Sequence, residues 1–317
     1  MNTPTTAAPA TESRASGSHA ADRLAALIDA AGAPACVGLD PVYDKLPGAL
    51  RCGTGGLTGL NAAATGPLSA IARFCAGVLE ACRGVVPVIK PQSACFERYG
   101  PEGVAVLAQV CSLARDMGFF VLLDAKRGDI GVTAEHYAAM AFDAMRADAV
   151  TLSGFMGPDT IEPFLKHAGT GRMVFVLVRT SNPGSDTLQS LALADGRTVA
   201  EATADMVASI GQPRLGTSGL SNVGAVVAAT KPQDGPALRA RMPNSIFLIP
   251  GYGAQGGSAA DIRGMIRPKS ASAGTAGVLV TASRSVIYAG SSGDGDWQGA
   301  VNHAAKSLVA ELAPLTR

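Results

Sequence analysis

Eight short apolar segments recur along the chain, and a stretch with helical character follows most of them. Their apolar residues are nearly continuous, a pattern typical of parallel strands that are buried on both faces. In chain order they are PACVGLD (34–40), VVPVIKP (85–91), FFVLLDAK (119–126), DAVTLSG (148–154), MVFVLVRT (173–180), VGAVVAAT (223–230), SIFLIPG (245–251) and GVLVTASR (277–284). Eight strand–helix units in one run predict an α/β fold, the (β/α)8 TIM barrel, rather than an open doubly wound sheet.

The stretches between the apolar segments predict helices. Gly100-Pro101 is expected to begin a helix on which Val104, Leu107, Cys111 and Ala114 share one face. Thr133 is expected to cap the next helix, and apolar spacing from Trp297 to Leu308 marks the last one. A further helix over residues 22–30 precedes the first strand, and we expect it to cover the floor of the barrel.

Length and local composition predict a single domain. The chain has 317 residues, and one α/β barrel commonly uses roughly 250. We expect the barrel to span residues 21–317 and residues 1–20, rich in Thr, Ala, Pro and Ser, to form a disordered tail. The connection at 43–66 is unusually long and rich in Gly and Ala. We interpret it as a surface insertion, with a lid over the site as the alternative.

Charge and cysteine usage argue against several kinds of partner. A net charge of +1 gives no field that would attract nucleic acid or an anionic membrane, and no segment is apolar over the roughly 20 residues that a membrane span requires. The six cysteines form no CxxC pair and have no zinc-like spacing with histidine, so we expect reduced thiols and no metal site. The expected location is the cytoplasm, with an organellar transit peptide as the alternative.

Charged residues lie at the carboxyl ends of the first three predicted strands. Asp40 ends the first strand, Lys90 ends the second, and Asp124 and Lys126 end the third. Residues two apart in a strand face the same side, so Asp124 and Lys126 should project together, and Gly128 should allow a turn that brings Asp129 round. The carboxyl ends of barrel strands form the active-site face. A buried ion-pair network that serves only stability is the alternative, and it is weak because such pairs are often costly.

An alternating Lys–Asp–Lys–Asp array has a definite chemical use. Neighbouring carboxylates keep a lysine protonated, and a positioned ammonium group can stabilise a carbanion and then protonate it. Schiff-base chemistry needs a neutral amine instead. Both routes stay open from the residues alone, but the carboxylates favour the first.

Two late loops predict a phosphate site. Residues 251–256, GYGAQG, match the GxGxxG pattern of dinucleotide sites, but no acidic residue follows at the required distance. The loops after strands seven and eight of a barrel commonly bind phosphate. They would contribute Gln255, Ser283 and Arg284, whose guanidinium suits bidentate contacts. After the fifth strand, Ser181 and Asn182 can bond a heterocyclic amide, although such residues are more often turn formers.

The segment DAKRGDIG at 124–131 closely resembles the signature of orotidine 5′-phosphate decarboxylases. Flanking pieces agree in order: GLDP at 38–41, VIKPQ at 88–92, TSNPG at 180–184, PGYGAQGG at 250–257 and TASRSVIY at 281–288. The resemblance runs from about Pro34 to the final helix and is closest to the longer bacterial branch of that family. It implies decarboxylation of orotidine 5′-monophosphate to uridine 5′-monophosphate without a cofactor.

The resemblance also implies roles for the charged residues. Asp40 would contact the ribose hydroxyls with Lys90 alongside, Asp124 would lie beside the substrate carboxylate, and Lys126 would protonate C6 as carbon dioxide leaves. The residue that matches Asp129 reaches into the partner subunit's site, with Ile130 and Thr133 nearby. A homodimer with shared active sites is therefore expected.

The remaining site residues follow from the same resemblance. Ser181 matches the residue that reads the pyrimidine ring, Gln255 and Arg284 match phosphate contacts, and Pro250 lines the pocket. Ser283 stands where many relatives carry glycine, and its backbone N–H is expected to donate to the phosphate in the same way.

Two other functions compete with this interpretation. A related barrel that decarboxylates or condenses sugar phosphates shares the D-x-K-x-x-D core but needs Mg²⁺, and it would lack the TSNPG and GAQGG/SR segments. A catalytically silent nucleotide-binding barrel belongs to another class, and the intact charged positions argue against it.

Overall fold

A closed barrel of eight parallel strands forms the centre of the molecule, in the order β1 to β8, with β8 paired to β1. The computed structural model describes residues 18–52, 66–253, 256–291 and 295–316. The strands are β1 Ala35–Leu39, β2 Val88–Pro91, β3 Phe120–Arg127, β4 Ala149–Leu152, β5 Met173–Arg179, β6 Val223–Val227, β7 Phe247–Ile249 and β8 Val278–Ala282. Each lies within one predicted apolar segment, apart from Arg127 at the end of β3, and the predicted (β/α)8 fold is confirmed.

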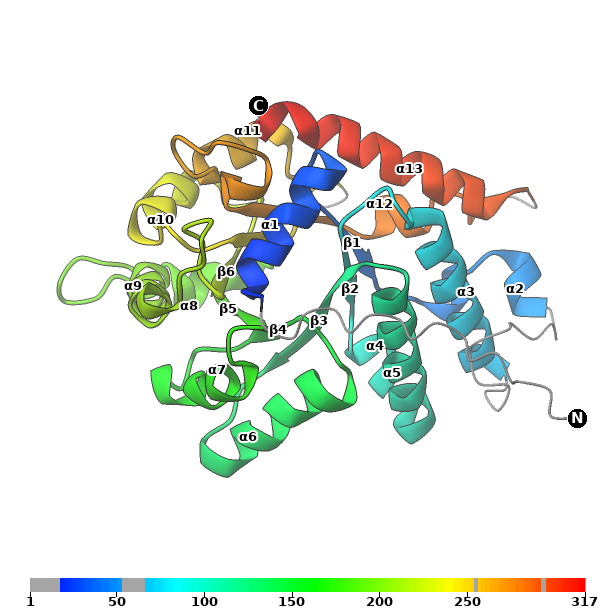
Figure 1. Cartoon of the computed structure of the whole chain (residues 1–317), viewed down its shortest axis with the longest axis horizontal. Helices are drawn as coiled ribbons and strands as arrows, with labels where there is room; N and C mark the ends of the chain where they lie inside the picture. Colours follow the sequence, from blue (N-terminus) through cyan, green and yellow to red (C-terminus); the bar gives the residue numbers. More distant parts are fainter. Residues whose placement is uncertain (1–17, 53–65, 254–255, 292–294, 317) are drawn as a thin grey trace, which may run out of the picture.

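Helices surround the barrel (Figure 1). They are α1 Ala20–Ala31, α2 Gly48–Cys52, α3 Gly66–Cys82, α4 Ala94–Glu97, α5 Gly100–Asp116, α6 Gly131–Ala139, α7 Glu162–Ala168, α8 Asp186–Gln189, α9 Val199–Gly211, α10 Gly235–Arg241, α11 Ala259–Ile262, α12 Arg284–Ile287 and α13 Trp297–Leu312. The predicted starts at Gly100 and Trp297 are confirmed. Of the four residues expected to share one face of α5, Leu107, Cys111 and Ala114 are buried, whereas Val104 is 36% exposed. Between β7 and β8 the described residues form only short elements: α11 and two 3-10 turns, Arg263–Met265 and Gly274–Ala276.

Alternate residues of the strands belong to two separate apolar clusters. In β3, Val121 and Leu123 belong to the cluster that the outer helices cover, whereas Phe120 and Leu122 belong to a second cluster with α1. Because side chains alternate between the two faces of a strand, the second cluster fills the barrel interior. The interior positions are therefore fixed by a spacing of two along each strand.

Helix α1 covers the floor of the barrel, as the sequence predicts. Its buried residues Leu24 and Ile28 pack in the interior cluster, and the helix crosses in front of the strands in Figure 1. Polar contacts hold α1 in place. A guanidinium nitrogen of Arg23 lies 2.7 Å from Asp148 Oδ1. The carboxylate of Asp22 accepts hydrogen bonds from the backbone N–H groups of residues 217 and 218. The floor is therefore closed by a segment that precedes β1.

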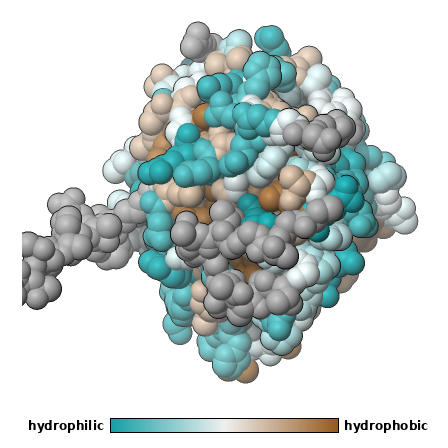
Figure 2. Space-filling model, turned by 90° about the vertical axis from the view of Figure 1, so that its right-hand side faces the viewer, coloured by the Kyte–Doolittle hydropathy of each residue, from teal (hydrophilic) through white to brown (hydrophobic). Residues whose placement is uncertain are grey.

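Two predicted features fall partly on residues that the structure does not describe. The 43–66 connection contains a 3-10 turn, Tyr43–Lys45, and α2, while residues 53–65 lie outside the described part, so the choice between insertion and lid is not tested. Residues 1–17 of the expected tail are also outside it. Within the described ranges no helix has the length and apolar character needed to cross a membrane. Figure 2 shows strongly hydrophobic residues in small separate areas of one face.

Candidate active site

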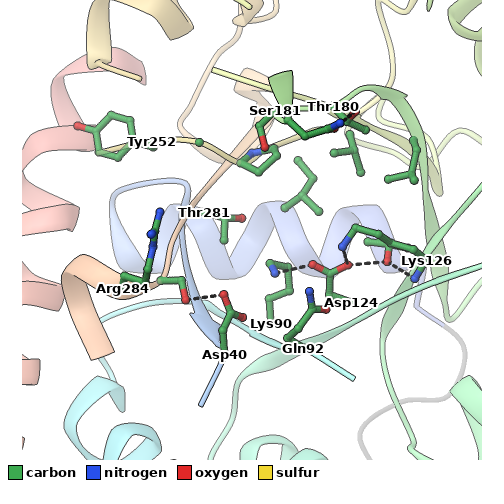
Figure 3. Close-up of a pocket in the computed structure, with 18 of the residues that line it drawn as sticks. Asp40, Lys90, Gln92, Asp124, Lys126, Thr180, Ser181, Tyr252, Thr281 and Arg284 are labelled. Carbon is green, nitrogen blue, oxygen red and sulfur yellow. Dashed lines mark hydrogen bonds and ion pairs between the residues drawn. The ribbon is translucent and has the colours of Figure 1, made fainter. Parts of the chain in front are cut away.

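The interior positions of the strands change from apolar to polar towards the carboxyl ends. In β3 the interior residues Phe120 and Leu122 are followed, two positions on, by Asp124; in β2, Val88 is followed by Lys90. The same spacing directs Asp40, Thr151 and Thr281 inwards. A cavity of about 520 Å³ opens here, and all five polar residues line it together with Lys126 (Figure 3). The strand alternation that builds the core thus also gathers the charged groups.

Asp124 lies between two lysine ammonium groups. Its Oδ2 is 2.7 Å from Lys90 Nζ, and its Oδ1 is 2.6 Å from Lys126 Nζ. Burial alone would lower the pKa of Lys90, but the carboxylates of Asp124 and Asp40 outweigh burial and raise it above its ordinary value. Burial would likewise raise the pKa of Asp124, whereas the two lysines hold it well below its ordinary value. Lys90 and Asp124 are therefore both charged at neutral pH.

The two lysines differ in exposure. The side chain of Lys90 is 7% exposed and that of Asp124 is 10% exposed, whereas the side chain of Lys126 is 47% exposed. Of the two lysines, Lys126 is thus the one that a ligand in the cavity can approach more easily, while Lys90 holds Asp124 from the buried side.

Thr151 of β4 fixes the backbone and the carboxylate at the end of β3. Its hydroxyl donates to Asp124 Oδ1 at 2.9 Å and accepts from the N–H groups of Ala125 and Lys126 at 3.1 and 2.9 Å. These bonds accompany a φ of 46° at Lys126, in the left-handed region that non-glycine residues rarely adopt, and a register shift between β3 and β4. The sequence interpretation missed Thr151. Its signal is a hydroxyl at an interior position of an otherwise apolar strand.

Asp129, Ile130 and Thr133 do not line the cavity of the described chain. Asp129 Oδ1 accepts a hydrogen bond from the N–H of Ile130 at 2.8 Å, and the side chain of Ile130 is 59% exposed. Thr133 was wrongly predicted to cap α6, because this helix begins at Gly131 and its N-cap, Ile130, makes no side-chain cap bond. Gly128 does not have the left-handed backbone expected of a turn glycine. A Cβ there would approach the carbonyl oxygen of Ser153 to 3.1 Å, so close packing explains the glycine.

The end of β5 brings Ser181 to the cavity, together with Thr180 and Asn182. Gln189, at the end of α8, holds Thr180 at two points: Gln189 Oε1 accepts from the backbone N–H at 2.9 Å, and Gln189 Nε2 donates to the hydroxyl at 2.9 Å. The hydroxyl of Thr180 in turn donates to Asn182 Oδ1 at 2.8 Å. Gln189 was not singled out from the sequence, because nothing in its local pattern separates it from a surface helix residue.

The loops after β7 and β8 lie on another side of the same cavity. Pro250, Tyr252, Ser283 and Arg284 line it, whereas Gln255 lies outside the described residues. The hydroxyl of Tyr252 donates to Glu311 Oε2 on α13 at 2.9 Å, and burial raises the pKa of Tyr252 to about 12. Figure 3 shows Arg284 near the Asp40 side of the cavity, away from Lys126. A cation thus lies at each of two separated parts of the cavity.

Known proteins resemble this chain over almost its whole length. Residues 35–293 match the model of the orotidine 5′-phosphate decarboxylase / HUMPS family. An orotidine 5′-phosphate decarboxylase of Rhodopirellula baltica is 38% identical over 307 residues, covering 92% of this chain and 98% of the relative. One from Variovorax paradoxus is 43% identical over 289 residues, covering 90% and 95%.

Solved structures agree with these matches. The OMP decarboxylase of Leishmania donovani is 32% identical, with a TM-score of 0.73 and coverage of 94% of this chain and 98% of that one. The orotidine 5′-monophosphate decarboxylase of Plasmodium berghei has a TM-score of 0.74 at 15% identity, over 94% and 98% of the two chains, and shows likeness of fold alone.

Proposed function

The chain belongs to the orotidine 5′-phosphate decarboxylase / HUMPS family, and we propose that it decarboxylates orotidine 5′-monophosphate to uridine 5′-monophosphate and carbon dioxide. This reaction is a carboxy-lyase step and the last one of de novo pyrimidine nucleotide synthesis. The observation that carries the proposal is the Lys90–Asp124–Lys126 array at the mouth of the barrel, in which a buried ion pair holds an exposed lysine, in one cavity with Arg284.

The charged array suits the electronic demand of this reaction. Loss of carbon dioxide from C6 leaves a lone pair in the plane of the pyrimidine ring, where the π-system cannot delocalise it. The developing negative charge must be met by a nearby cation, and preorganised charge in a cavity is effective at this. Lys126 Nζ is the proposed cation and then the donor of the proton to C6.

Asp124 and Lys90 are proposed to prepare Lys126 for this role. Asp124 bonds the ammonium group of Lys126 at 2.6 Å and is itself held by Lys90 and Thr151, so its orientation is fixed before the ligand arrives. Its negative charge would also lie beside the substrate carboxylate. The chemistry proposed here needs no cofactor, because the lysine provides both the charge and the proton.

The rest of the cavity is proposed to bind the nucleotide. Ser181 would bond the pyrimidine ring and Asp40 the ribose. Arg284, Gln255 and the backbone N–H of Ser283 would bond the phosphate, while Pro250 lines the pocket. The phosphate lies far from C6, so its binding energy would serve closure and positioning rather than the chemical step directly.

A homodimer with shared sites is proposed as the working assembly. Its support is the position of Asp129 outside the cavity of its own chain and the exposure of nearby apolar residues, namely Ile130 at 59%, Val132 at 65%, Phe155 at 79% and Met156 at 48%. In a dimer, Asp129, Ile130 and Thr133 would complete the partner's site.

Mixing the inactive variants Lys126→Ala and Asp129→Ala under conditions of subunit exchange should restore activity, because some sites then have both native residues. If none returns, Asp129 acts within its own chain.

The ultraviolet assay for loss of orotidylate tests the function directly. The purified chain, with chelator and without added cofactor, should turn over orotidine 5′-monophosphate. The alternative function, a sugar-phosphate decarboxylase or aldolase of the same fold, predicts inert orotidylate and a magnesium requirement. Two further proposals rest on sequence composition: a barrel domain over 21–317 that follows an N-terminal tail, and a cytoplasmic location. Ala20, which the sequence predicts to lie in the tail, is the first residue of α1.

A further inference from the structure

The hydroxyl of Ser283 points to the carboxylate of Asp40. Ser283 Oγ donates to Asp40 Oδ2 at 2.7 Å and lies 3.2 Å from the carbonyl oxygen of Gly38. Figure 3 draws the first of these bonds beside Arg284. The approach depends on the absence of a side chain in β1, because a Cβ at Gly38 would stand 2.9 Å from Ser283 Cβ. β1 and β8 are therefore matched in shape at this point.

The second oxygen of Asp40 has no such partner. Asp40 Oδ1 is buried and makes no hydrogen bond with any described residue, although Asp40 lines the cavity. The main chain of Asp40 is also held, because the hydroxyl of Tyr288 donates to its carbonyl oxygen at 2.9 Å and accepts from Val42 N–H at 2.7 Å. A buried carboxylate oxygen without a donor is costly, and a ligand that offers a hydroxyl would satisfy it.

We propose that Ser283 is a positioning residue that acts through Asp40 and makes the site selective for a ribose over a deoxyribose nucleotide. The inference rests on the proposed function. Ser283 occupies Oδ2 and fixes the rotation of the carboxylate, so that Oδ1 accepts a hydrogen bond from one hydroxyl of the ribose. The side chain of Ser283 therefore serves the sugar, whereas Arg284, the next residue, serves the phosphate.

The test measures how much each ribose hydroxyl contributes to binding. Calorimetry gives dissociation constants for UMP, 2′-deoxyUMP and 3′-deoxyUMP, and the ratio of each deoxy value to the UMP value is the penalty for losing that hydroxyl. Asp40→Ala identifies the ribose hydroxyl that Asp40 binds, because the penalty for removing that hydroxyl should disappear in this variant. Ser283→Ala should reduce the same penalty on the order of tenfold, since hydrogen bonds to charged groups have this strength, and leave the other penalty unchanged.

Ser221→Ala is the matched control. The hydroxyl of Ser221 likewise lies close to a carbonyl oxygen, that of Gly211, to which it donates at 2.9 Å. Ser221 is buried and lies just before β6, at the amino end of the barrel. This variant should keep both penalties. Thermal unfolding checks that Ser283→Ala folds. If this variant does not fold, Ser283→Gly, which also removes the hydroxyl, is measured instead, and the same penalty should fall by the same factor.

The outcomes separate the two claims. A native chain that neither decarboxylates orotidylate nor binds UMP contradicts the proposed function, and the inference with it. An active native chain whose Ser283 variants keep the full penalty overturns the inference alone. Equal weakening of all three nucleotides also overturns it, because Ser283 would then act on the phosphate or on packing. The inference is also overturned if Asp40→Ala keeps both the 2′-deoxy and the 3′-deoxy penalty.

Discussion

Replacing the buried pair Lys90–Asp124 tests whether the array exists for stability or for function. The two charges are 2.7 Å apart, and their Coulombic attraction is about 6 kcal/mol at an effective dielectric constant of 20, before the cost of removing both from water. Removing one partner of such a pair typically costs about 3–5 kcal/mol, because the other charge stays buried. In Lys90→Met, Asp124 keeps its bonds to Lys126 and Thr151. We therefore expect a loss of about 3 kcal/mol, or roughly 6 °C in Tm.

The double variant Lys90→Met/Asp124→Leu separates the two explanations. It leaves neither buried charge, and apolar replacements of buried ion pairs are often neutral or stabilising. Urea unfolding should thus show that the double variant regains most of the stability that Lys90→Met loses, while the orotidylate assay shows no activity. If the double variant is instead less stable than Lys90→Met, the pair stabilises the fold, and the reasoning that assigns it to catalysis is wrong.

Three further predictions concern the same cavity. Lys126→Ala should abolish decarboxylation in the ultraviolet assay while UMP still binds by calorimetry, and unchanged turnover would refute its assigned role. Arg284→Ala should chiefly raise KM through lost phosphate contacts, so an unaltered KM removes it from the site. The stability difference between the native chain and Lys90→Met should be flat between about pH 5 and 9 in urea unfolding. The difference should shrink as the pH rises above 10.5, the ordinary lysine pKa, because the folded pKa of Lys90 is raised and the contribution is lost as Lys90 deprotonates. It should also shrink as the pH falls below 3.8, the ordinary aspartate pKa, because the folded pKa of Asp124 is lowered and the contribution is lost as Asp124 takes up a proton. A slope between about pH 5 and 9 would contradict this.

The sequence predicts the barrel and its charged rim because both depend on the same local rule. Continuous apolar segments indicate buried parallel strands. Because residues two apart in a strand face the same side, Lys90 faces the barrel interior like Val88, and Asp124 like Leu122. Fold and array could therefore be predicted together.

Other features depend on contacts that no local pattern encodes. Thr151 acts on β3 from a different strand: its hydroxyl accepts from the N–H of Lys126, whose left-handed backbone residue preference does not predict. The predicted cap at Thr133 failed because the chain turns into α6 two residues earlier. The proposed role of Asp129 depends on a second chain, since this residue does not line the cavity of its own chain.

The helix that closes the barrel floor has a practical consequence. The family match covers residues 35–293, and so omits α1 and α13, although Leu24, Ile28, Val301 and Leu308 on these helices are buried. A chain trimmed to the matched limits would uncover apolar surface at the bottom and on the side of the barrel, and such surfaces promote aggregation. The segment that matches the family model is therefore shorter than the segment that must be expressed to obtain an enzyme that does not aggregate.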